Sequence, residues 1–173
     1  MAVHPSYRVK VGLSDWAQDV LRKRVYAVLA TMKPDGSSHT IPVGFAFDGE
    51  RLLIPSGSGT RKVRNIEADP RVRVLVQAPP AAMGGDGWVA ADGTAHIVGG
   101  DEAQRLNRMA SDRYLTEAGQ ATYEEVMGPI MDVTIVVRPE RWQMWSDSMM
   151  FESILERGYA EEEAANWFLP PES

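Results

Sequence analysis

Three extended runs separated by tight turns constrain the fold of this chain more than any other feature of its sequence. Residues 25–31, 38–47 and 51–55 are rich in branched and aromatic side chains, which favour strands. Lys33-Pro34-Asp35-Gly36 separates the first two runs; its proline presets one φ angle and its glycine accepts positive φ. Asp48-Gly49 is a similar signal before the third run. The pattern predicts an antiparallel meander.

Four short helices are predicted around and beyond this meander. Val63 and Ile66 lie three residues apart and share one helical face, and Asp69-Pro70 ends that helix. Asp101, with Gln104 three residues later, resembles a capping box at the start of another helix. We therefore expect helices over residues 60–68, 101–114, 118–126 and 149–166.

Three further strands complete the predicted sheet. Asp92-Gly93 predicts a turn or bulge inside one of them, and Pro139 predicts the end of another. We expect strands over residues 72–77, 88–98 and 130–137, a continuation of the last over 141–145, and a loop rich in proline and glycine over 78–87. Six strands, mostly joined by short turns, fit a small antiparallel barrel better than a parallel sheet.

The chain length and the charge distribution indicate one domain with an acidic end. A chain of 173 residues suffices for one compact domain. Residues 1–139 carry 16 basic and 16 acidic side chains, whereas residues 140–173 carry 2 and 8. We expect residues 1–145 to form the barrel and residues 146–173 an acidic helical extension of it. The balanced body argues against nucleic-acid binding, which needs a basic face.

Several other classes of protein are excluded by what the sequence lacks. It contains no cysteine, which excludes disulfides and thiolate chemistry. Its longest charge-free stretches, residues 36–47 and 74–85, are broken by polar residues, glycine or proline, so no membrane partner is expected. The first residues lack the features of a signal peptide, and we expect a cytoplasmic protein.

Common catalytic signatures are also missing. No dinucleotide fingerprint, Walker phosphate loop, nucleophile elbow or paired histidine motif is present, so we expect neither a catalytic metal nor a catalytic dyad. The three histidines are interpreted as exposed or hydrogen-bonded residues. Haem ligation by His39 or His96 stays open as an alternative.

The segment that points to a ligand is Ser56-Gly57-Ser58-Gly59-Thr60-Arg61-Lys62. A loop with several hydroxyl groups enters a helix whose first turn carries two adjacent cations. The first N–H groups of that helix, its positive dipole end and the Arg61 and Lys62 side chains can converge on one anion. A phosphate monoester fits this description. The other interpretation is a solvated helix start whose charges offset an acidic surface.

The order of these pieces resembles a known family. Residues 28–31, 34–36, 39–45, 48–49, 60–66 and 69–72 resemble the split β-barrel flavin-binding superfamily, which includes pyridoxamine 5'-phosphate oxidase and the flavin/deazaflavin-dependent oxidoreductases. The resemblance implies a mainly β, six-stranded antiparallel split barrel of the FMN-binding type. It further implies a homodimer with two cofactor sites at the subunit interface.

The resemblance also implies where the cofactor binds. The tricyclic ring would lie against the second strand and contact mainly backbone groups, while the loop and the helix start would hold the ribityl and phosphate oxygens. The implied residues are Ile41, Pro42, Val43 and Gly44 for the ring, Ser56, Ser58, Thr60, Arg61 and Lys62 for the ribityl phosphate, and Asn65 and Gln77 as secondary candidates.

One departure from the family's pattern narrows the range of expected substrates. Pyridoxamine phosphate oxidases recognise their substrate with a basic C-terminal signature, whereas this chain ends in an acidic stretch that includes residues 161–163. The arginine-rich composition and the second strand look more like the branch that uses the deazaflavin coenzyme F420, typical of actinobacteria. The sequence does not decide between F420 and FMN.

These observations predict an F420- or FMN-dependent oxidoreductase that transfers a hydride to or from a small conjugated molecule. The coenzyme does the electronic work, which explains why no catalytic dyad is visible. Trp88, Met83, Trp142, Met144 and Trp145 would form an apolar substrate wall, unless they pack in the core or in an interface. The alternatives are a carrier or sensor without turnover and a haem-binding split barrel.

Overall fold

The computed structural model describes residues 8–10, 12–78 and 87–165. Its strands are β1 (Arg8–Lys10), β2 (Ala27–Met32), β3 (Ser38–Val43), β4 (Ala46–Phe47), β5 (Leu52–Ser56), β6 (Arg71–Gln77), β7 (Gly87–Gly99) and β8 (Val133–Ser146). Its helices are α1 (Asp15–Arg22), α2 (Arg61–Ala68), α3 (Gly100–Ser111), α4 (Glu117–Met127), α5 (Asp147–Leu155) and α6 (Glu161–Ala165). The mainly β class predicted from the sequence is therefore confirmed. The predicted turns join two antiparallel pairs, β2 with β3 and β4 with β5, but the two pairs lie at opposite edges of the sheet and do not form one meander.

All strands belong to one antiparallel sheet with the order β3-β2-β6-β7-β8-β5-β4, and β1 pairs with β8. The expected count of six strands is wrong, because β1 adds a strand and the run 38–47 divides into β3 and β4. The division lies at Phe45, whose N–H donates to Oη of Tyr114 and whose carbonyl accepts from Arg113. These side chains replace the strand partners that a continuous ladder would need. Among the described residues, no ladder joins β3 to β4.

The longest ladder pairs β7 with β8 over their whole lengths. Its register shifts between Asp92 and Gly93, which confirms the predicted irregularity. Asp92 pairs with Arg141 and Gly93 with Pro139, so one residue of β8 has no counterpart there. The bulge lets β8 continue past Pro139, where the sequence predicted an end, because a proline is tolerated at a break in the ladder.

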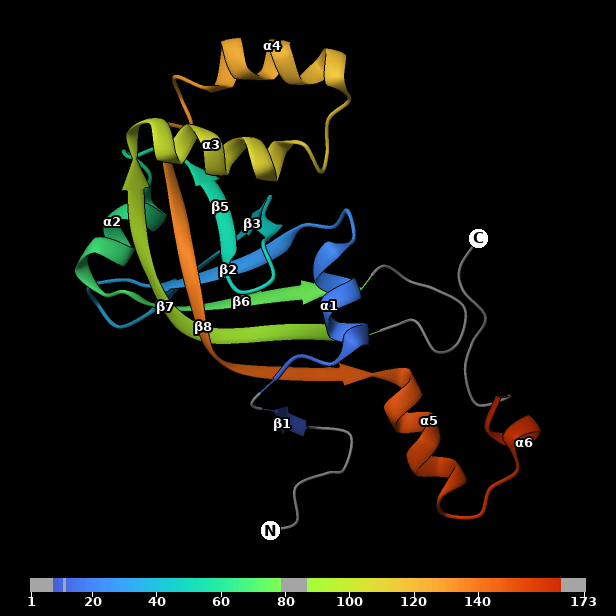
Figure 1. The fold of residues 1–173 in the computed structure, drawn as a ribbon. Coiled ribbons are helices and arrows are strands. Elements are labelled where there is room, and N and C mark those ends of the chain that lie inside the picture. The colour runs from blue at the N-terminus through green and yellow to red at the C-terminus, as the bar shows by residue number, and fades with distance from the viewer. Residues whose placement is uncertain (1–7, 11, 79–86, 166–173) are drawn as a thin grey trace.

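The two sides of the sheet are covered differently. The inner side holds the main core, to which α1 contributes Ala17, Val20 and Leu21 and α2 contributes Val63 and Ile66. The outer side is covered by α3 only over β5, β7 and the first part of β8. Figure 1 shows α3 lying across the ends of these strands, with α4 stacked above it.

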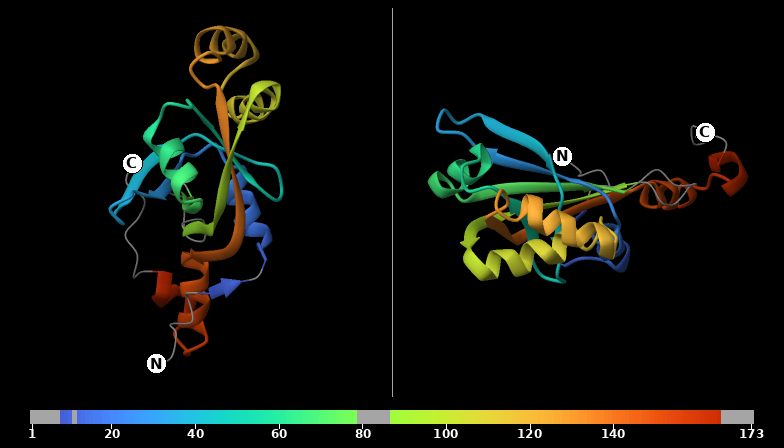
Figure 2. Two further views of the ribbon diagram at one scale, coloured as in Figure 1. Left: turned by 90° about the vertical axis from the view of Figure 1, so that its left-hand side faces the viewer. Right: turned by 90° about the horizontal axis from the view of Figure 1, so that it is seen from above.

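The helices depart from the predicted ones at their ends. Gly99 precedes α3 as its N-cap and forms no side-chain cap, so the capping box predicted at Asp101 is wrong. The single helix expected over 149–166 is two helices, α5 and α6, because Gly158 at φ +89° reverses the chain between them. Both project away from the sheet beyond the end of β8 (Figure 2). In the described ranges, no helix combines the length and apolarity needed to cross a bilayer.

The bulge gives a testable prediction about folding. A Cβ at Gly93 would overlap the Arg138 carbonyl oxygen on the neighbouring strand. We expect Gly93→Ala to lower the free energy of unfolding by about 1–3 kcal/mol, since backbone must shift to make room. Gly12→Ala is the control, because nothing lies within 4 Å of its added Cβ. Urea denaturation measures both, and equal stability of the two variants would contradict the close approach.

Candidate functional site

The loop after β5 enters α2 without a side-chain cap. Thr60 is the N-cap residue, but its hydroxyl lies 3.1 Å from the Ser56 hydroxyl and does not bond the helix N–H groups. The first backbone N–H groups of α2 therefore lack an acceptor from the cap residue, and the positive end of the helix dipole is not offset there. No acidic residue lies in the first turn of α2. This end of the helix is suited to an anion.

Two cations lie at the same helix end, as the sequence predicted. Lys62 is half-buried, and burial lowers its pKa below the ordinary lysine value. Arg61 is exposed. Within the described part of the chain, neither side chain has a hydrogen bond or an ion pair. A partly buried ammonium without an anionic neighbour is unfavourable, and a bound anion would relieve that cost.

A carboxylate outside the predicted set fixes the loop. Oδ1 of Asp132 accepts from the backbone N–H of Ser58 at 2.7 Å, and Oδ2 accepts from its hydroxyl at 2.7 Å. These hydrogen bonds lower the pKa of Asp132. Arg64 adds a 2.5 Å bond to the Gly59 carbonyl oxygen. The Ser58 hydroxyl therefore donates to Asp132 in this structure, and its role toward a phosphate stays a prediction.

Two other predicted polar residues stabilise the fold around the helix start. Ser56 is fully buried and bonds within its own loop. The Asn65 side chain is buried and donates to Oγ1 of Thr31 at 2.9 Å, which ties α2 to β2. Arg61, Lys62 and the N–H groups of the first turn are then the groups left to hold an anion.

The strand residues implied for the ring point in alternate directions. Ile41 and Val43 pack against the core, whereas Pro42 is exposed on the outer side, where it pairs with Val28. Gly44 follows β3 and lies against the ring of Tyr114; a Cβ added to this glycine would lie 3.6 Å from Cε2 of the ring. The backbone of this segment is thus placed between β2 and the end of α3.

Arg113 and Tyr114, which sequence reasoning missed, hold this segment. Oη of Tyr114 donates to the Val25 carbonyl at 2.8 Å, and the Arg113 guanidinium stacks 4.5 Å from the centre of the Phe45 ring. Arg113 also donates to the carbonyls of Phe45 and Lys23, and burial lowers its pKa. No short motif marks the pair, because its partners are mainly backbone groups distant in sequence.

The predicted substrate wall is only partly assembled. Trp142 and Met144 belong to the main core, with 9% and 0% exposure, and so cannot line a substrate. The prediction that they line a substrate is wrong, because side chains alternate along β8 and these two point into the core. Gln77, Trp88 and Trp145 occupy one row across β6, β7 and β8 on the outer side. Met83 lies outside the described residues.

The two histidines kept open for haem lie on separate strands. His39 is half-buried on β3, and His96 is exposed on β7. In the part of the chain that the structure describes, no group of three or more histidine, aspartate or glutamate side chains is arranged to hold a metal ion. The haem hypothesis gains no support from this arrangement and stays untested.

Comparison with known families now adds to this geometry. The family described as pyridoxamine 5'-phosphate oxidase matches residues 13–146, from the start of α1 to the end of β8. The chain belongs to this family. The match covers β2 to β8, the loop before α2 and both helices of the α3–α4 pair. Membership confirms the superfamily resemblance inferred from the sequence.

Solved structures of related folds agree with this assignment. A structure titled F420 reductase is 29% identical, with a TM-score of 0.58, covering 75% of this chain and 98% of that chain. A conserved hypothetical protein from Mycobacterium tuberculosis is 23% identical, with a TM-score of 0.67, covering 83% and 91%. A putative pyridoxamine 5'-phosphate oxidase from Listeria innocua is 20% identical, with a TM-score of 0.55, covering 73% and 93%. Chains of similar fold thus carry names for different activities.

The buried hydrogen bond between Asn65 and Thr31 predicts that Asn65 stabilises the fold even without a cofactor. We expect Asn65→Ala to lower the free energy of unfolding by about 1–3 kcal/mol, because the buried Thr31 hydroxyl then accepts no hydrogen bond from α2. Glu67→Ala, at an exposed position of the same helix, should change it by less than about 0.5 kcal/mol. Chemical denaturation without any coenzyme gives both values. Unchanged stability of the Asn65 variant would argue against this structural role.

Proposed function

We propose that this protein is an oxidoreductase that uses coenzyme F420, with FMN as the alternative coenzyme, to transfer a hydride to or from a small conjugated organic molecule. The observation that carries the proposal is the start of α2. An uncapped helix end, an exposed arginine and a half-buried lysine meet there, and the lysine has no anionic partner among the residues that the structure describes. This donor set fits a phosphate monoester, which both coenzymes contain.

The comparisons support a flavin-type coenzyme. The structure titled F420 reductase is 29% identical to this chain, and nearly the whole of that chain is covered. The choice of F420 over FMN rests on this likeness and on the arginine-rich composition of the chain. The acidic side chains of α6 stand at the end of the chain where pyridoxamine phosphate oxidases carry a basic signature, and this departure argues against a pyridoxamine phosphate substrate.

Each group of the site has a separate task in this proposal. Lys62, Arg61 and the first N–H groups of α2 hold the phosphate, while Asp132 keeps the loop in place through Ser58. The backbone from Ile41 to Gly44 supports the ring, and Arg113 fixes the end of that segment. When bound, the coenzyme supplies the hydride chemistry. The protein then supplies position and exclusion of water.

Coenzyme titration tests the proposal. We expect the wild-type protein to bind F420 or FMN, and Lys62→Ala to weaken that binding by roughly 10- to 100-fold, the loss of one charge-assisted contact. Fluorescence titration of both coenzymes measures the dissociation constants. The matched control is Lys23→Ala, which removes the same charge from an exposed position at the end of α1.

Three outcomes of the titration are informative. Equal weakening by both variants would indicate a general charge effect and would contradict the assigned site. Failure of the wild-type protein to bind either coenzyme would overturn the proposed function. Binding without turnover of enones, quinones or other conjugated substrates would instead favour a carrier or sensor.

The proposal includes a homodimer in the cytoplasm, and one face of the sheet fits a second copy. Over β3, β2, β6 and β7 the outer side carries Pro42, Val28, Leu75 and Trp88, and among the described residues none of the core-forming helix residues faces it. Beside this patch, Asp92 accepts hydrogen bonds from two arginines. Burial raises the pKa of Asp92, but these hydrogen bonds lower it by more, so the pKa lies below the ordinary aspartate value. An apolar patch with a charged rim is typical of subunit interfaces.

A charge in this patch tests the dimer. Leu75 is half-buried on β6 and pairs with Val28 on one side and Ala90 on the other. We expect the wild type to be a dimer and Leu75→Glu a monomer, because two buried carboxylates would repel each other across the twofold axis. Light scattering after gel filtration gives the mass. The control is Val126→Glu, at an apolar side chain on α4 that is 57% exposed; a monomeric wild type would rule out the interface.

A further inference from the structure

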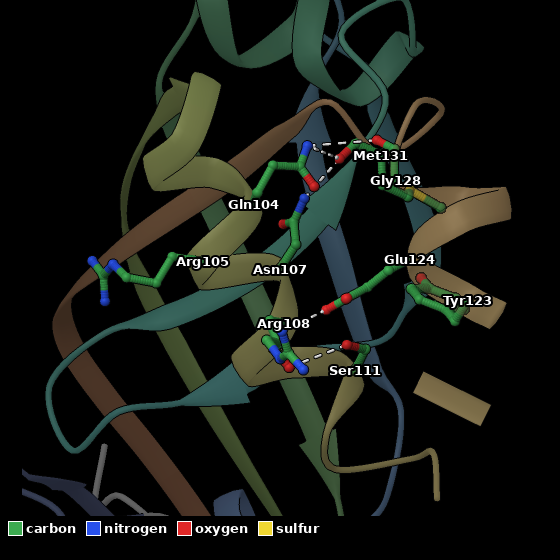
Figure 3. A pocket seen from close by; sticks show the side chains of 9 residues that line it. All are labelled: Gln104, Arg105, Asn107, Arg108, Ser111, Tyr123, Glu124, Gly128 and Met131. Carbon is green, nitrogen blue, oxygen red and sulfur yellow. Dashed lines mark hydrogen bonds and ion pairs between the residues drawn. The ribbon is translucent and has the colours of Figure 1, made fainter. Parts of the chain in front are cut away.

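A cavity of about 430 Å³ lies between α3 and α4, apart from the anion site at α2. Figure 3 shows the side chains around it, which come from α3, α4 and the turn leading to β8. A second hollow of about 110 Å³ adjoins the cavity and shares Ser111, Tyr123 and Met131 with it. Together the two hollows have the size of a site for a small organic molecule.

Polar contacts link α3 and α4 on either side of the cavity. Gln120 is the one buried side chain of α4, and its Nε2 donates to the Ser111 hydroxyl at 2.6 Å. Arg108 pairs with Glu124 across the gap at 3.2 Å. On the α3 side, the Asn107 amide donates to the Met131 carbonyl at 2.8 Å. The space between these contacts is therefore bordered by fixed groups on both sides.

One polar group that lines the cavity has no partner. The Tyr123 hydroxyl belongs to a half-buried side chain and has no hydrogen bond within the described part of the chain. Oε1 of Gln120 is buried and also has no partner among the described residues, but Gln120 does not line the cavity. A ligand in the cavity can therefore form a hydrogen bond with the Tyr123 hydroxyl.

One cation that faces the cavity can bind an anionic ligand. Arg108 lines the cavity next to a single carboxylate, Glu124. The Arg108–Glu124 pair uses one guanidinium nitrogen, and the two side chains are 59% and 43% exposed, so solvent weakens the pair. Other N–H groups of Arg108 are then free to bind a carboxylate, which matches the guanidinium fork. The Arg105 side chain points away from the cavity in Figure 3.

The smaller hollow leads toward the segment that would support the coenzyme ring. It is lined by Gly44 and Pro55 as well as by the end of α3. We propose that the cavity binds a flat conjugated carboxylate, with its anionic group at Arg108 and its apolar part against Tyr123 and Met131. That such carboxylates are the substrate class of the protein rests on the proposed function. That the cavity binds them rests on the cavity alone.

Calorimetry with 2-naphthoate and its neutral analogue 2-naphthylmethanol tests this site in the full chain. We expect 2-naphthoate to bind one site per chain, and Arg108→Gln to weaken it about tenfold while leaving the neutral analogue unchanged. Arg105→Gln is the matched control: it removes the same charge from the same helix but from a side chain that points outward, and should change affinity less than about twofold. The thermal midpoint of each variant verifies folding.

The outcomes separate the two proposals. Absence of saturable 2-naphthoate binding, or an equal effect of the two arginine variants, overturns the cavity site even if the coenzyme binds normally. Binding of 2-naphthoate that depends on Arg108, in a protein that binds neither coenzyme, supports the site and overturns the proposed function. With both proposals correct, Arg108→Gln leaves the coenzyme dissociation constant unchanged, whereas Lys62→Ala changes it.

Discussion

The ladder between β7 and β8 is the interaction on which the rest of this structure depends. It pairs the two longest strands over their full lengths, and the other parts of the sheet attach to one or the other of them: β6 to β7, and β5 and β1 to β8. Its bulge changes which residues of β8 face inward. As a result, Trp142 and Met144 enter the core on one side of the bulge, and Ile135 and Val137 enter it on the other. One irregularity thus allows a single strand to serve both halves of the sheet.

Local signals in the sequence were enough to predict the two hairpins, the bulge and the helix after the Ser56–Gly59 loop. These features depend on residues close in sequence, such as a proline before a turn or apolar residues three apart. The division of the run 38–47 was not predictable in this way. It depends on Arg113 and Tyr114, which capture backbone groups nearly 70 residues away. Pro139 was misread for the same reason, since its effect depends on the opposite strand.

The candidate site shows the same division between local and distant information. Arg61 and Lys62 could be proposed from the sequence because they stand in the first turn of a predicted helix, where the structure also has them. Ser58 and Asn65 were assigned to the cofactor because their side chains suit it, but their partners in the fold are Asp132 and Thr31. Polar residues near a binding loop can support the loop as readily as they bind the ligand. Only the three-dimensional contacts distinguish the two roles.

The carboxylate of Asp132 connects two segments that lie 74 residues apart, and this connection would affect how tightly the loop binds a ligand. A glycine-rich loop left free would lose conformational entropy each time it closed around a ligand. Here two hydrogen bonds to the same serine order the loop when the chain folds. The entropic penalty therefore falls on folding rather than on association, and preorganisation of this kind tightens binding without adding any contact to the ligand.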